Sequence, residues 1–253
     1  MSQPFAIAAA QSVSAAGDVQ GNVGRHLAFL HEAAARHVRL VVFLVVFPEL
    51  SLTGYESAIA HEVAMYADDA RLAPLQNACV QNGLTAVVGA PLRFDDGVRI
   101  GALALMPDGK VVTYTKQHLH PGEGAVFTAG AGGPPISVDG QTIALAICAD
   151  TTHPEHAEQA SGMGATLYAA GALITAKGYA TDTALLQQYA MQHRFGVLMA
   201  NHGATTGGWS PIGRSAFWDE DGRCVIAADG LGPALVIAHR TGVGWRGEAV
   251  SVG

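Results

Sequence analysis

Cys148 is the residue of this chain best suited to covalent chemistry, because of where it stands in the sequence. It comes at the end of an apolar, strand-like run within Thr142–Asp150 (TIALAICAD), and Pro154 shortly after it suits the first turn of a helix. A thiol between a strand end and a helix N-terminus lies in a field that favours the thiolate, the nucleophilic form of cysteine. A buried structural cysteine is the commoner explanation for one cysteine taken alone, so other segments must decide.

Two other strand-like runs end in charged groups that complement a thiol. Glu49 lies within Leu44–Glu56 (LVVFPELSLTGYE), where a carboxylate can serve a site at the edge of a sheet, although a solvated strand-end glutamate is the alternative. Lys116 ends another apolar run and precedes a Pro/Gly-rich loop that holds Glu123. Only three of the 14 lysines and arginines are lysines, which suggests that Lys116 has a role that a guanidinium cannot fill.

The hydrophobic pattern predicts alternating strands and helices that would position these strand ends. Strands are predicted at Phe5–Gln11, Leu40–Phe47, Thr85–Ala90, Gly101–Met106, Lys110–Thr115, Thr142–Cys148, Leu167–Ala170, Val197–Ala200, Ser215–Trp218, Arg223–Ala227 and Ala234–Ala238. Helices are predicted at Val19–Arg36, Arg71–Asn82, Pro154–Met163 and Thr183–Arg194. Such β-hairpins and βα units indicate sheets that helices cover on one face.

The order Glu49, Lys116, Cys148 resembles that of the nitrilase, or carbon–nitrogen hydrolase, superfamily, and the resemblance extends over nearly the whole chain. Each motif alone is weak, but all of them in order form a strong signal. They are AAAQSVSAAGDVQGNV near the N-terminus, FPELSLTGY around the first glutamate, K-x-H-L before the second, ICAD followed by HPE, the block Ala190–Asn201 (AMQHRFGVLMAN), and Gly213–Ser215 with Asp221 and Gly222.

The chain departs from the superfamily pattern in three places. Gln192 and His193 stand where relatives carry Glu-Asn, and Thr151–His153 stands where many relatives carry arginine and an aromatic residue. The motif LVVF is repeated directly, at Leu40–Phe43 and at Leu44–Phe47. We expect the second copy to occupy the strand position, because Glu49 is tied to the end of that strand. The first copy would then prolong the strand or bulge toward the preceding helix.

The resemblance implies a four-layer α-β-β-α sandwich, formed by residues 1–253 as a single domain. It assigns Cys148 as the nucleophile, with Glu49 as a general base whose pKa is raised in a shielded site. Lys116 and the backbone N–H of Ala149 would stabilise the oxyanion. Glu123 matches the second glutamate of the superfamily, which orients the substrate and the lysine.

Further contacts and partners follow from the same resemblance. Tyr55 and His153 are expected to line the substrate pocket, while Asp150 and Asn201 are expected to hold the turn at the cysteine. No cofactor is implied. A homodimer or larger assembly is implied, paired across the helix after Cys148 and the block near residue 190.

The composition agrees with a single α/β domain and excludes several classes of partner. With 253 residues, of which 49% are hydrophobic and 14% charged, the chain can bury one large core. A net charge of −7 without a basic stripe argues against nucleic acid as a partner, and no apolar run is long enough to span a membrane. Three widely spaced cysteines argue against disulfides and structural zinc and favour a cytoplasmic protein.

Four histidines near the lysine and cysteine segments raise the alternative of a metal-dependent active site. His118 and His120 flank the lysine segment, and His153 and His156 follow the cysteine, so HLH and HPEH resemble metal-ligand spacing. However, the pattern lacks the helical i, i+4 pair with a glutamate base that hydrolytic zinc sites use. The sequence therefore predicts catalysis without a metal.

The predicted function is metal-independent hydrolysis of a non-peptide C–N bond, in a small linear amide or N-carbamoyl compound, through a cysteine thioester that releases ammonia. A nitrilase is one alternative, although relatives that act on nitriles usually read Cys-Trp-Glu, and this chain reads Cys148-Ala149-Asp150. A catalytically weak member kept as a dimeric interaction module is the second alternative.

Overall fold

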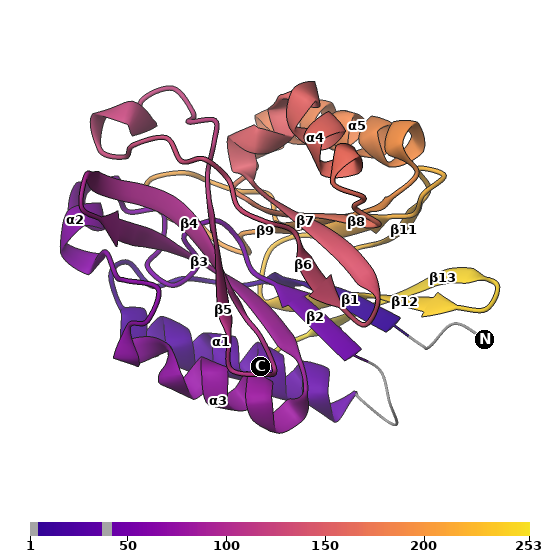
Figure 1. The fold of residues 1–253 in the computed structure, drawn as a ribbon, viewed down its shortest axis with the longest axis horizontal. Helices are drawn as coiled ribbons and strands as arrows, with labels where there is room; N and C mark the ends of the chain where they lie inside the picture. The colour runs from indigo at the N-terminus through magenta and orange to yellow at the C-terminus, as the bar shows by residue number, and fades with distance from the viewer. Residues whose placement is uncertain (1–4, 37–41) are drawn as a thin grey trace.

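Two β-sheets stacked face to face, each covered on its outer side by helices, form the protein (Figure 1). The computed structural model describes residues 5–36 and 42–253. Helices α1 (Val19–Ala35) and α3 (Ala73–Asn82) cover one sheet, and helices α4 (Pro154–Gly162) and α5 (Ala176–His193) cover the other. The predicted four-layer α-β-β-α sandwich is confirmed.

The first sheet has the strand order β13-β12-β1-β2-β3-β4-β5. Strands β1, β2 and β3 are parallel, and the remaining neighbours are antiparallel. The strands are β1 (Phe5–Gln11), β2 (Val42–Val46), β3 (Thr85–Phe94), β4 (Gly97–Leu105), β5 (Val111–Thr115), β12 (Ala234–Thr241) and β13 (Gly244–Ser251).

The second sheet has the strand order β11-β10-β9-β8-β7-β6, with β7, β8 and β9 parallel at its centre. Its strands are β6 (Ile136–Val138), β7 (Gln141–Ile147), β8 (Leu167–Ala172), β9 (Gly196–Asn201), β10 (Ala216–Trp218) and β11 (Cys224–Ala227). Short helical segments complete the described chain: α2 (Ala60–Val63) and the 3₁₀ helices Ser57–Ile59, Ala70–Leu72, Glu123–Ala125 and Cys148–Thr152.

The central strands are buried on both faces, which explains their continuous apolar sequences. In β1, Ile7 and Ala9 pack between the two sheets, whereas Ala8 and Ala10 pack against the layer of α1 and α3. This alternation is the two-residue period of a strand. Because both faces are filled, the ends of these strands are held rigidly, and functional side chains placed there are fixed.

Several predicted boundaries were wrong. β3 continues past Pro91 to Phe94 in a long hairpin with β4, in which Pro91 pairs with Ile100. Pro91 has no N–H to donate, but its carbonyl accepts a hydrogen bond from Met65 N. β6 and β13 were not predicted; β13 lies at a sheet edge and is half exposed, so it lacks an apolar run. Helix α5 begins at Ala176 rather than Thr183.

The repeated LVVF contributes to β2 from both copies. Val42 and Phe43 pair in register with β1, and they prolong the strand that Leu44 to Val46 continue. The side chains of the second copy, Leu44–Phe47, are buried. The first two residues of the first copy lie outside the described residues.

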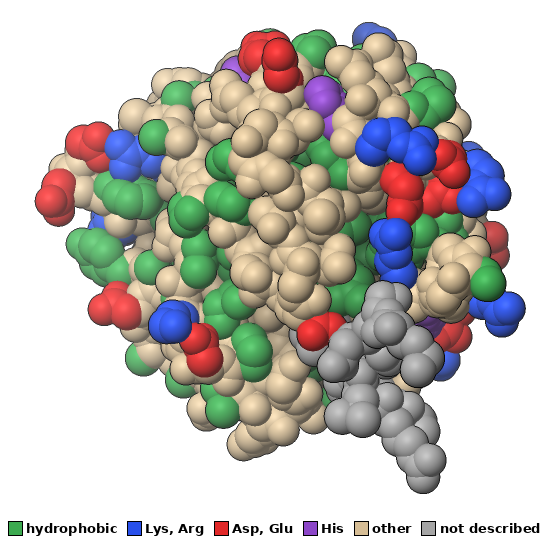
Figure 2. Space-filling model, turned by 45° about the vertical axis from the view of Figure 1, so that its right-hand side comes forward, with side chains coloured by type: hydrophobic (Ala, Val, Ile, Leu, Met, Phe, Trp, Pro, Cys, Tyr) green, Lys and Arg blue, Asp and Glu red, His purple; other side chains and the backbone are tan. Residues whose placement is uncertain are grey.

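The surface carries charges of both signs side by side. On the face shown in Figure 2, lysine and arginine side chains adjoin aspartate and glutamate side chains. Ion pairs of this kind link Arg36 to Glu248 at 3.3 Å and Arg240 to Glu220 at 2.9 Å. None of the helices in the described ranges is long and apolar enough to span a membrane.

Candidate active site

The ends of three strands bring four of the predicted residues together. Glu49 follows β2, Lys116 follows β5, and Cys148 follows β7 directly. Lys116 Nζ donates hydrogen bonds to Glu49 Oε1 at 2.6 Å and to Glu123 Oε1 at 2.7 Å. Glu49 and Cys148 line the same cavity of about 600 Å³. Residues from both sheets therefore meet in one buried, charged site.

Lys116 is an ammonium group buried between two carboxylates, with none of its surface exposed. Burial alone would lower its pKa, but the attraction of Glu49, Cys148 and Glu123 outweighs burial and raises the pKa above its usual range. A buried charge is tolerated only with such partners. The side chain thus remains a fixed positive charge beside the thiol.

Glu49 has the properties of a general base near neutral pH. Burial raises the pKa of its carboxyl to about 7, opposed mainly by the charge of Lys116, as the sequence predicted. Oε1 is held by the ammonium, whereas Oε2 has no conventional hydrogen-bond donor among the described residues. The thiol of Cys148 is near enough to lower the pKa of this carboxyl. Oε2 is therefore the oxygen left to accept a proton from the thiol.

Cys148 begins a sharp turn, and its backbone is in the left-handed region with φ of 46°. Non-glycine residues adopt this conformation at a cost, and such strain is found at functional sites. The expectation that a helix N-terminus would favour the thiolate was wrong. Burial raises the thiol pKa and Glu49 raises it further, while Lys116 opposes the shift. The surroundings of Cys148 therefore favour the thiol over the thiolate.

Glu123 is held by three donors. Besides Lys116, Tyr55 donates its hydroxyl to Oε1 at 2.5 Å, and the backbone N–H of His120 donates to Oε2 at 2.7 Å. The carboxylate therefore fixes the ammonium on the side opposite Glu49. Tyr55 in turn has its ring at the cavity wall.

Asp150 ties the cysteine turn to the segment after Lys116. Its Oδ1 accepts from the backbone N–H groups of Gln117 at 3.0 Å and His118 at 2.9 Å. Its Oδ2 accepts from the backbone N–H of Ile147 at 3.0 Å and from the Tyr114 hydroxyl at 2.7 Å. The predicted role of Asp150 in holding the turn agrees with these contacts.

Asn201 holds the cavity wall rather than the cysteine turn. Its side chain accepts from Ile174 N at 2.8 Å and donates to Ile174 O at 2.9 Å, next to Leu173 in the wall. The neighbouring His202 was not predicted. Its Nε2 donates to the backbone carbonyl of Glu49 at 2.7 Å, and burial lowers its pKa to about 4, so it stays neutral. This hydrogen bond fixes the position of the Glu49 backbone.

Two glycines let the chain approach the Glu49 turn closely. A Cβ on Gly171 of β8 would lie 2.6 Å from Phe47 O, and one on Gly89 of β3 would lie 2.5 Å from Pro48 O. Real Cβ atoms do not approach so closely, so any other residue would push the turn away. Neither glycine was predicted from the sequence, although a glycine inside an apolar strand is a signal for such a close approach.

The cavity wall contains all three residues predicted to bind substrate: Tyr55, Ala149 and His153. The rest of the wall comes from loops and from the first turns of α5, which the sequence analysis did not single out. These residues include Leu119, Leu173, Thr175, Lys177, Asp182 and Trp209.

The histidines separate into different environments. His156 is buried between the hydroxyls of Tyr114 at 2.7 Å and Tyr168 at 2.8 Å, so both of its ring nitrogens are occupied. The ring of His120 packs edge-on against Trp209. His118 and His153 stack on each other at the edge of the cavity.

Known proteins resemble this chain over nearly its whole length. A model of the carbon-nitrogen hydrolase family matches residues 6–243. A cysteine-to-serine mutant of an amidase of the nitrilase superfamily from Nesterenkonia sp. AN1 is similar, with a TM-score of 0.78 and 26% identity, covering 93% of this chain and 90% of that chain. A glutamate-to-leucine mutant of that amidase, with the acetamide moiety of fluoroacetamide added covalently at its active site cysteine, has a TM-score of 0.81 and 25% identity, covering 93% and 89%.

Proposed function

The chain belongs to the carbon-nitrogen hydrolase family, and from this premise we propose that it hydrolyses small linear amides or N-carbamoyl compounds through a thioester on Cys148, releasing ammonia. One observation supports this most: a buried Lys116 bridges Glu49 and Glu123 in hydrogen bonds of 2.6 and 2.7 Å. Removing two or more ionic groups from water is costly. An interaction module has no use for such a cluster beside a thiol.

The reaction begins with the resting thiol. Glu49 Oε2 takes the proton of Cys148 as the sulfur attacks the amide carbon, and the carbonyl oxygen becomes an oxyanion. Lys116 Nζ and the backbone N–H of Ala149 stabilise this charge, and each such donor is worth ~10²–10³ in rate. Glu49 then gives its proton to the leaving nitrogen, and ammonia departs.

The second half of the reaction regenerates the enzyme. Glu49 takes a proton from water, the hydroxide attacks the thioester carbon, and the acid leaves as the sulfur recovers a proton from Glu49. A pKa of about 7 suits a group that must both accept and donate a proton near neutral pH. Glu123 keeps the ammonium in place throughout both steps.

The cavity size supports a small substrate. Its volume of about 600 Å³ lies within the range of roughly 300–1,000 Å³ typical of small-molecule sites. Ala149 follows the nucleophile, which favours amides over nitriles on the resemblance described above.

The decisive experiment combines turnover with labelling of the thiol. A panel of aliphatic, ω-dicarboxylic and N-carbamoyl amides should include compounds from which the wild type releases ammonia, and Cys148→Ala should release none. Fluoroacetamide should add one acetamide group to Cys148, located by peptide mass spectrometry. Cys224→Ser, which removes an exposed thiol, is the matched control and should keep normal turnover. Equal turnover by the Cys148→Ala variant would refute the mechanism.

A further inference from the structure

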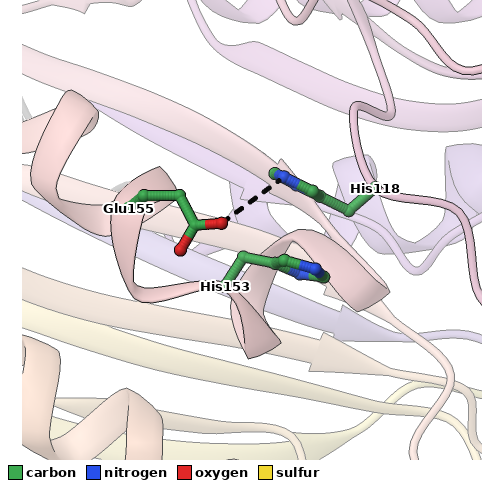
Figure 3. Close-up of side chains that lie close together, drawn as sticks. All are labelled: His118, His153 and Glu155. Atoms are coloured by element: carbon green, nitrogen blue, oxygen red, sulfur yellow. Dashed lines mark ion pairs between the residues drawn. The ribbon is translucent and has the colours of Figure 1, made fainter.

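Three side chains with metal-ligating atoms meet at the edge of the cavity: His118, His153 and Glu155 (Figure 3). Their ligand atoms all lie within 4.8 Å of one another. His118 Nε2 is 4.0 Å from Glu155 Oε1, and the two imidazole rings stack with centroids 3.8 Å apart. The three residues come from two segments far apart in sequence, the one after Lys116 and the one after Cys148.

Hydrogen bonds orient both imidazoles with the same nitrogen free for a ligand. His118 Nδ1 donates to Asp150 Oδ1 at 3.2 Å, and His153 Nδ1 donates to the backbone carbonyl of Ala149 at 2.8 Å. In each ring the proton is therefore on Nδ1, and the lone pair is on Nε2. Metal-bound histidines almost always have this second contact to a carboxylate or a carbonyl, which fixes the tautomer.

Glu155 supplies the third ligand from the first turn of α4. Its side chain is more than half exposed, so the carboxylate has room to rotate toward the rings. Ligand atoms around one zinc ion lie about 3.3 Å apart, given metal–ligand bonds of ~2.0–2.2 Å. The two ring planes are only 13° apart, so the Nε2 lone pairs run nearly parallel in the present arrangement. The rings must therefore tilt out of their stack, and the exposed Glu155 carboxylate must rotate toward them, for all three ligand atoms to meet one ion.

We propose that His118 Nε2, His153 Nε2 and a carboxylate oxygen of Glu155 form a binding site for a divalent transition-metal ion of the zinc type. Two imidazoles and a carboxylate suit zinc and its neighbours rather than calcium or magnesium, which prefer all-oxygen sites. Three protein ligands leave a fourth position open. The site differs from the catalytic group, since none of its ligands belongs to Glu49, Lys116 or Cys148.

The position of the site links it to the substrate. His153 lines the cavity that contains Cys148, and its ring is hydrogen-bonded to the carbonyl of Ala149. A bound ion would therefore become part of the cavity wall without taking part in the bond-breaking steps.

Zinc binding to the purified protein tests the proposal without any assay of turnover. The Cys148→Ala/Cys224→Ser background removes two thiols that would themselves take zinc. Isothermal titration calorimetry with zinc chloride should show one ion per chain, removable with EDTA. Replacing His153 with Asn or Glu155 with Gln should weaken binding by about tenfold or more, because even outer contacts of metal ligands are worth 10–100-fold.

Two control variants test whether removing any exposed histidine or carboxylate from the same loop or helix weakens zinc binding. His120→Asn removes an exposed histidine of the loop that follows His118, and Glu158→Gln removes an exposed carboxylate of α4. Both should bind zinc like the background, and circular dichroism should show that every variant is folded. The proposal fails if the background does not bind zinc saturably. It fails equally if His153→Asn and Glu155→Gln bind as tightly as the controls.

Discussion

Lys116 Nζ lies 2.6 Å from Glu49 Oε1, and neither side chain is exposed to solvent. The ammonium would by itself keep the carboxyl ionised at low pH, yet burial has the larger effect and raises the Glu49 pKa to about 7. The pair therefore combines a permanently charged lysine with a glutamate that can still be protonated, a combination that two such groups in water would not show. The lysine remains charged, while its partner exchanges a proton near neutral pH.

Activity should rise with pH through about 7. Glu49 acts as a base only when it is ionised, and its raised pKa means that it is protonated, and inactive, at lower pH. The acid limb of kcat/KM, measured with a neutral amide, should therefore lie near pH 7 rather than near the ordinary value for glutamate. Glu49→Gln should lower kcat by ~10²–10⁴ and remove this limb. An unchanged acid limb in the variant would show that another group titrates.

The two lysines at the ends of β5 provide a matched comparison. Lys116→Met should lower kcat by ~10²–10³ through loss of an oxyanion donor. It should also reduce the free energy of unfolding by ~3–5 kcal/mol, since two buried carboxylates lose their partner. Lys110→Met removes only an exposed ion pair with Asp108 and should change neither quantity appreciably. Steady-state kinetics and urea unfolding measure both effects. Equal stability of the two variants would contradict the buried ion-pair network.

Gly171→Ala should disturb the base without touching the substrate. The added Cβ would lie 2.6 Å from Phe47 O, so the turn that carries Glu49 must move. We expect a loss of ~1–3 kcal/mol in stability from overpacking, together with a lower kcat. Gly162→Ala, where an added Cβ meets nothing within 4 Å, is the control. Thermal unfolding and turnover should be measured for both; wild-type values for Gly171→Ala would show that the close approach is unimportant.

Exhaustive chelation should leave turnover intact. The proposed steps use Glu49, Lys116, Cys148, Glu123 and the backbone N–H of Ala149, and none of these groups is a ligand of the proposed zinc site. Dialysis against EDTA followed by the ammonia assay should give the same kcat before and after treatment. Loss of activity that zinc restores would instead place the ion in the reaction itself.

Sequence reasoning located the charged residues well because their signals are local. An apolar run predicts a buried strand, and Glu49 and Cys148 each follow one; Lys116 follows the edge strand β5, which is buried only at its C-terminal end. β2 and β7 belong to the parallel parts of the two stacked sheets, and β5 is the edge strand beside the antiparallel β4. The stacking of the sheets brings these three strand ends together. The family resemblance supplied the pairing of the two sheets, which no single segment encodes.

What sequence reasoning missed depends on contacts between distant segments. The hydrogen bond from His202 to the Glu49 carbonyl joins residues separated by 153 positions. The close approach of Gly171 to the Glu49 turn is likewise a property of the packed sheets. The rise in the Cys148 pKa was missed for the same reason, because it comes from burial and from Glu49, a carboxylate of a distant segment.

The hydrogen bonds to Asp150 have a consequence for how the site exchanges substrate and product. They join the strand end before Cys148 to the Tyr114 hydroxyl and to the backbone after Lys116, so Cys148 and Lys116 are held in one frame. An opening cannot come from separating these two without breaking a buried carboxylate's contacts. The start of α5 and the partly exposed Trp209 also line the cavity and make none of these hydrogen bonds to Asp150. We therefore expect substrate selectivity to depend on this part of the wall, which can change while Cys148 and Lys116 stay fixed.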